Sequence, residues 1–70
     1  MAVSYKKLWK ILIDRDMTKT MLRKEAGIST GALAKLGKNE NVNTEILVRI
    51  CNTLHCDISD IMELVEEVKE

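Results

Sequence analysis

Apolar residues recur at the three- and four-residue spacing of an α-helix through most of the chain. This spacing predicts five short helices, over about residues 4–15, 18–26, 29–37 and 43–54, and from residue 57 onward. Each predicted helix begins at a side chain suited to an N-cap, namely Ser4, Thr18, Ser29, Asn43 and Asp57. Proline is absent and no β-hairpin signal is present. The sequence therefore predicts an all-α, five-helix bundle that forms one domain over residues 1–70.

The predicted helices each have one apolar stripe, which we expect to face a shared core. The expected core residues are Tyr5, Leu8, Trp9, Leu12, Met21, Leu22, Leu33, Leu36, Ile46, Leu47, Ile50, Leu54, Ile58, Ile61, Met62 and Val65. A chain of 70 residues can bury only a small core, so idealised helix packing has to supply its stability.

The composition argues against an enzyme, a metal protein and a membrane protein. The chain has one histidine, two cysteines and no glycine-rich phosphate loop, so we expect neither catalysis nor a cofactor. Cys51, His55 and Cys56 have a C-x3-H-C spacing that lacks a fourth ligand, and a thiol or metal sensor is the remote alternative. Apolar runs reach only three residues, whereas a membrane span needs about 20. We expect a cytoplasmic protein.

The charges are balanced in sum but divided along the chain. Residues 1–38 hold nine lysines and arginines against three acidic residues, a net charge of +6. Residues 39–70 hold two basic and eight acidic residues, a net charge of −6. Such asymmetry favours polyanion binding by the first half, although a merely solvated surface is the alternative.

The second and third predicted helices are separated by only Gly27, Ile28 and Ser29, as in a helix-turn-helix. On a helical wheel, Leu33 and Leu36 point inward. The opposite face carries Thr30, Gly31, Ala34, Lys35 and Lys38. Small residues allow close approach and lysines reach phosphates or guanine edges, so this face suits a DNA major groove. A solvent-facing helix that happens to contain small residues is the alternative.

Lys19 follows the cap Thr18 and so lies at the positive end of a helix dipole, where a cation is disfavoured. A phosphate docked there would reverse the sign of this interaction. A lysine that swings into water is an equal alternative.

The stretch MTKTMLRKEAGISTGALAKLGKNENVNTEILVRICNTLHCDISDIMEL resembles the Cro and phage-repressor type helix-turn-helix (XRE) family, in its small single-domain branch. The resemblance covers about residues 4–65. It implies a lambda-repressor-like bundle, sequence-specific binding of double-stranded DNA, and a homodimer on palindromic operators.

The resemblance also assigns roles to positions of this chain. Lys19 stands where the family commonly has a glutamine that touches the DNA backbone or a base. The positions that contact base edges are Thr30, Gly31 and Lys35, and those that contact the backbone are Ser29, Lys38, Asn39 and Asn41. Three residues depart from the family pattern: Arg23 replaces alanine, Gly37 replaces glutamate and Asn39 replaces glycine. Gly31 removes one base-contacting side chain, so DNA shape has to contribute to specificity.

These observations predict a small transcriptional regulator that represses by blocking promoter access, with no membrane or small-molecule partner evident. We expect Leu64 and Val68 to form a dimer surface, because they lie off the inward stripe of the fifth predicted helix. The alternative is a helical protein-interaction module, or an antitoxin-like partner, that does not itself contact DNA.

Overall fold

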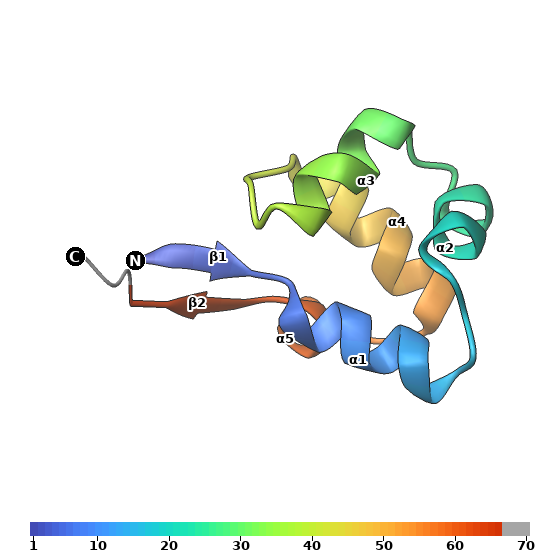
Figure 1. Cartoon of the computed structure of the whole chain (residues 1–70), viewed down its shortest axis with the longest axis horizontal. Helices are drawn as coiled ribbons and strands as arrows, with labels where there is room; N and C mark the ends of the chain where they lie inside the picture. The colour runs from blue at the N-terminus through green and yellow to red at the C-terminus, as the bar shows by residue number, and fades with distance from the viewer. Residues whose placement is uncertain (67–70) are drawn as a thin grey trace.

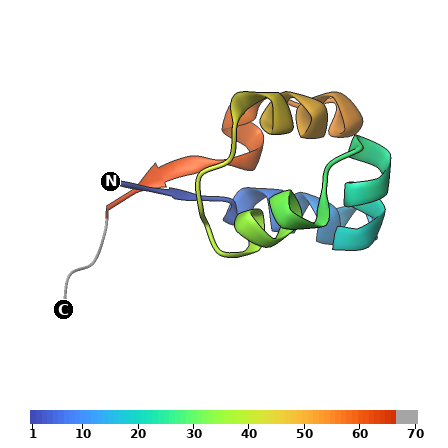
Figure 2. The same cartoon turned by 90° about the horizontal axis from the view of Figure 1, so that it is seen from above.

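Five helices surround one core, and the two ends of the described chain pair beside them. The computed structural model describes residues 1–66, and the elements within it are β1 (Ala2–Ser4), α1 (Lys6–Asp14), α2 (Lys19–Ala26), α3 (Thr30–Gly37), α4 (Thr44–Leu54), α5 (Ile58–Ile61) and β2 (Glu63–Val65). Both views show β1 and β2 extending away from the helices as a narrow ribbon (Figures 1 and 2). The five predicted helices are therefore present. The prediction of an all-α fold is correct only in part, because it omits this strand pair.

Four of the five predicted N-caps are confirmed. The side chains of Thr18, Ser29 and Asn43 each accept a hydrogen bond from the backbone N–H three residues on, at 3.1 Å. Asp57 and Asp60 form a reciprocal capping box at the start of α5. Each such cap is worth about 1 kcal/mol, so the boundaries of α2, α3 and α4 follow from local sequence.

The core lies where the inward faces of the helices meet. Its buried apolar residues are Tyr5, Leu8, Leu12, Leu22, Ala26, Ile28, Leu36, Leu47, Ile50, Leu54 and Ile61. Met21, predicted to be a core residue, is 44% exposed, because α2 buries the side that carries Leu22 and Ala26 and Met21 lies about 100° around the helix from Leu22. Within residues 1–66, no helix is long and apolar enough to cross a membrane.

The first helix begins later than predicted. Ser4 belongs to β1, and the N-cap of α1 is Tyr5, whose side chain makes no capping bond. Tyr5 is buried and is held from outside the helix: its N–H donates to Asn39 Oδ1 at 3.0 Å and its hydroxyl donates to the Glu40 carbonyl at 2.9 Å. Ser4 Oγ accepts only a long hydrogen bond, of 3.4 Å, from the Lys6 N–H, and the two long-range bonds fix Tyr5 at the start of α1.

The fifth helix is much shorter than predicted. It ends at Ile61, and Met62 adopts an extended conformation that leads into β2. β2 pairs antiparallel with β1, so that Leu64 lies opposite Val3 and Val65 opposite Ala2. The helical placement of Leu64 and the inward placement of Val65 are therefore wrong, and both side chains are exposed. Val68 lies outside the described residues.

Candidate nucleic-acid interface

The turn between α2 and α3 fixes how the second helix crosses the first. Gly27 ends α2 in the left-handed conformation, with φ of 68°, and the N–H groups of Gly27 and Ile28 both donate to the Arg23 carbonyl. This is the hydrogen-bonded glycine stop expected of a helix C-terminus. Ile28 is buried, so the turn is anchored in the core before the Ser29 cap starts α3.

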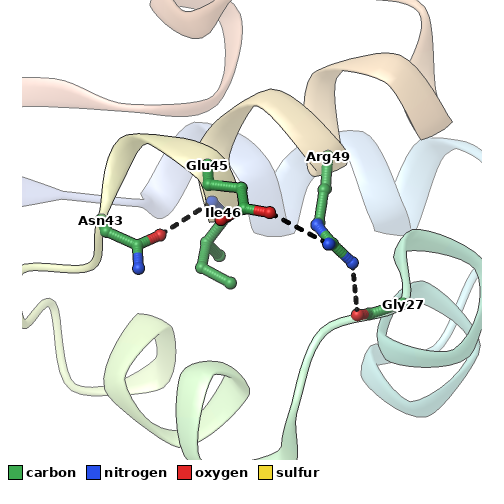
Figure 3. Close-up of polar contacts among 5 residues, drawn as sticks. All are labelled: Gly27, Asn43, Glu45, Ile46 and Arg49. Atoms are coloured by element: carbon green, nitrogen blue, oxygen red, sulfur yellow. Dashed lines mark hydrogen bonds and ion pairs between the residues drawn. The ribbon is translucent and has the colours of Figure 1, made fainter.

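A side chain from α4 braces this turn. Arg49 donates through Nη1 to the Gly27 carbonyl at 3.1 Å and through Nη2 to Glu45 Oε1 at 3.0 Å (Figure 3). The Glu45 pair lies within one helical turn and orients the guanidinium. Sequence reasoning missed Arg49, because its partner in the turn is 22 residues away and leaves no local signal.

The two faces of α3 differ, as the helical wheel predicts for Leu36, which is fully buried. Leu33 is only half-buried and is not part of the core cluster, and Ala32 packs against the core instead. The side chains on the opposite face are exposed, and they are Thr30, Gly31, Ala34 and Lys35. The exposed face of α3 therefore carries small side chains and one lysine.

Gly31 is not required by the fold. Its φ lies outside the left-handed region, and a Cβ built on it would meet Ser29 Oγ at 3.8 Å, an ordinary contact distance. A side chain would thus fit at this position of the free protein. Packing within the described chain therefore does not require glycine at this position.

Two surface grooves flank Lys35. One, of about 300 Å³, lies between the starts of α3 and α4 and is lined by Ser29, Gly31, Ala32, Lys35, Val42, Asn43 and Ile46. The other, of about 630 Å³, lies between the ribbon and the loop after α3 and is lined by Met1, Ala2, Val3, Lys35, Asn39, Glu40, Asn41 and Leu64. Five predicted DNA-binding residues thus line these grooves, with Lys35 in both. Ala34, Lys38 and Thr30 are exposed on or beside α3 but line neither groove.

The loop after α3 is tied to the start of α1. Asn39 adopts the left-handed conformation, with φ of 56°, which asparagine tolerates better than most residues other than glycine. Its Oδ1 is bonded to the Tyr5 N–H, so the oxygen of this predicted backbone contact already has a structural partner. Lys38 is the C-cap of α3 and is exposed.

Lys19 contacts Trp9, which the helical spacing predicts only as a core residue. Its Nζ lies 4.5 Å from the centroid of the Trp9 ring, within the range of a cation–π interaction. Trp9 is half-buried, packs against the core and belongs to α1, whereas Lys19 is the first residue of α2. The helical spacing that identifies Trp9 as apolar gives no sign of this pairing.

The lysines of the candidate interface have no acidic partners in the described part of the chain. The ion pairs within residues 1–66 are Lys7–Glu63 at 3.6 Å and Arg49–Glu45 at 3.0 Å. Lys19, Lys35 and Lys38 therefore face solvent without a neutralising carboxylate from these residues. Such ammonium groups can neutralise phosphates and release counterions.

The thiols lie at the far end of α4 from this surface. The N–H of Cys56 donates to the Cys51 carbonyl at 3.1 Å, across the left-handed C-cap His55. Burial, and then the neighbouring Cys56 thiol and acidic side chains, raise the pKa of Cys51 to about 11. No three His, Cys, Asp or Glu side chains of residues 1–66 are placed to hold a metal ion.

The arrangement of α2, the glycine turn and α3 is that of a helix-turn-helix protein. A family model for the Cro/C1-type HTH DNA-binding domain matches residues 7–67, and the chain belongs to this family. It is also similar to the crystal structure of the transcriptional regulator VanUg, Form II, with a TM-score of 0.91 and 56% sequence identity over 94% of this chain and 88% of that chain. A search of the curated proteins found no match. The family and this neighbour support a DNA-binding regulator.

Proposed function

We propose that the protein binds double-stranded DNA in a sequence-dependent way by docking α3 in the major groove. The supporting observation is the exposed face of α3, which combines small residues, a glycine that the fold does not need, and Lys35. The major groove is about 12 Å wide and admits a helix whose outer face carries mostly small side chains. In this pose Thr30 and Lys35 contact base edges, and Gly31 and Ala34 allow the close approach.

The residues around α3 then contact the sugar-phosphate backbone. They are Lys19, Ser29, Lys38, Asn39 and Asn41, all of which are exposed. Contacts of this kind fix position and orientation without carrying sequence information. With base contacts limited to two side chains, the shape and deformability of the site supply the remaining specificity.

Occupancy of a promoter site by this domain would act as repression, by blocking access to the DNA. We propose that two copies bind half-sites about 34 Å apart, which is one turn of DNA.

Leu64 remains a candidate for the dimer contact, now as part of the β1–β2 strand pair. It is 60% exposed and shares a groove with Met1, which is 81% exposed. Light scattering should give a dimer that Leu64→Asp converts to a monomer; an unmodified chain that stays monomeric at high concentration contradicts this surface.

The docking of α3 is tested by fluorescence anisotropy on random-sequence duplex at two salt concentrations. We expect affinity to fall steeply as salt rises, because bound phosphates release counterions. Lys35→Ala should weaken binding, because it removes a side chain from the face that enters the groove. Lys38→Ala removes a proposed phosphate contact and should lower the slope of log affinity against log salt by about 0.9. Lys10→Ala is the matched control, since Lys10 is an exposed lysine on α1 and lies outside the proposed interface.

Two results would oppose the proposal. Equal effects of Lys35→Ala and Lys10→Ala would mean that charge, and not the placement of α3, controls binding. No binding to duplex even at low salt, with a protein partner recovered instead, would favour the protein-interaction alternative.

A further inference from the structure

Trp9 and Lys19 form a contact between α1 and α2 at the edge of the proposed DNA interface. The Lys19 ammonium lies 4.5 Å from the ring centroid of Trp9. Trp9 packs against the core, so the position of its ring is set by the fold and not by the lysine. Both residues also line a groove of about 260 Å³ whose other walls are mostly apolar.

The ring changes the electrostatics of a lysine in an unfavourable place. Lys19 is the first residue of α2, where the helix dipole repels a cation. The face of an indole ring carries negative charge density and attracts the ammonium. The Lys19 ammonium thus lies against the ring, at this helix end, in the protein without DNA.

We propose that Trp9 is a positioning residue of the DNA interface, whose ring holds the Lys19 ammonium where it contacts a phosphate. This inference rests on the proposed function, in which Lys19 contacts the DNA backbone. One face of the ammonium lies against the ring, and its remaining N–H donors are available to a phosphate oxygen. Because the fold has already ordered this flexible side chain, binding a phosphate costs less conformational entropy.

The experiment is a double-mutant cycle on duplex affinity at fixed low salt, using Trp9→Leu and Lys19→Met. Lys19→Met keeps the unbranched stem and removes the charge. We expect Trp9→Leu to weaken binding about two- to fivefold when Lys19 is present, the range that a lost cation–π contact gives. In the Lys19→Met background, the same change at Trp9 should have no effect. The conservative Trp9→Tyr, which retains a ring, should restore most of the loss.

A second measurement separates positioning from folding. Trp9 is the only tryptophan in the chain, so its emission reports directly on the ring. Adding duplex should change this emission in the unmodified protein and leave it unchanged in Lys19→Met, a variant that keeps the ring. Urea midpoints of all variants show whether a weakened binder is also a less stable protein.

Each outcome bears on one claim. If the unmodified protein does not bind duplex, the proposed function fails. If it binds but Trp9→Leu weakens both backgrounds equally, Trp9 has only a structural role and this inference is overturned. Tighter binding by Trp9→Leu would overturn it as well, because the ring would then hold Lys19 away from the DNA. An unchanged affinity in Lys19→Met would remove Lys19 from the interface.

Discussion

Substituting Gly31 should separate what the fold needs from what the interface needs. Gly31 is exposed, lies in the first turn of α3 and has a conformation open to any residue. The Cβ of alanine would meet Ser29 Oγ at 3.8 Å and so would leave the Ser29 cap in place. Gly31→Ala should therefore stabilise the protein by about 0.5–1 kcal/mol, because the unfolded chain loses freedom at no cost in contacts.

A larger side chain at Gly31 should weaken DNA binding, although it should not lower the stability of the protein. Gly31→Leu places a large side chain on the face that enters the major groove, while leucine remains a good helix former. We expect this variant to keep or exceed the stability of the unmodified protein and to bind duplex at least tenfold more weakly, equivalent to about 1.4 kcal/mol. Loss of affinity without loss of stability would locate the close approach at the start of α3.

Gly37 provides the matched control within the same helix. A Cβ at Gly37 would meet no atom within 4 Å, and its φ also lies outside the left-handed region. Gly37→Ala should raise stability like Gly31→Ala and leave DNA affinity unchanged. With a slope near 1 kcal/mol per M urea for a small protein, each gain appears as a rise of roughly 0.5–1 M in the denaturation midpoint. Gly31→Leu binding as tightly as Gly37→Ala would refute the docking of this face.

Two further predictions concern the brace and the thiol. Arg49→Met removes the hydrogen bonds to Gly27 and Glu45. We expect urea denaturation to show a free energy of unfolding lower by about 0.5–1.5 kcal/mol, and we expect weaker binding to duplex. An unchanged affinity for duplex would show that the turn keeps its geometry without Arg49. Burial raises the pKa of Cys51 to about 11, so its thiol should react with iodoacetamide at pH 8 more slowly in the folded protein than in the urea-unfolded protein. Mass spectrometry measures the two rates, and equal rates would contradict the prediction. The folded state favours the protonated Cys51 thiol, so this contribution to stability is present below about pH 9 and is lost as pH rises through about 11.

Features set by neighbouring residues could be predicted from the sequence. The caps Thr18, Ser29 and Asn43 bond to N–H groups three residues away, and their helices begin where predicted. Gly27 supplies a left-handed stop that few other residues adopt. The helical wheel places Leu36 in the core for the same reason, because a helix has a fixed period, although Leu33, also predicted to face inward, is not part of the core cluster.

Features set by distant residues could not be predicted in this way. Met62 to Val65 include good helix formers, and the capping box at Asp57 favours continuing the helix. Glu63–Val65 is instead a strand because Ala2–Ser4, some 60 residues earlier, supplies its hydrogen-bonding partner. Lys7 adds to this choice, since its ammonium contacts both Glu63 and the Ser59 carbonyl. Pairing between chain ends leaves no periodic signal within either segment.

Lys19 shows how a local conflict in the sequence can indicate a tertiary contact. A cation at the positive end of α2 is unfavourable on local grounds, and the sequence leaves open whether solvent or a phosphate compensates. The fold supplies a third answer, because α1 brings the Trp9 ring to the Lys19 ammonium. The ring and a phosphate are not exclusive partners, since an ammonium has three N–H donors and the ring occupies only one side. A residue that contradicts its local environment is therefore a place to look for a distant partner, and here that partner lies beside the proposed DNA surface.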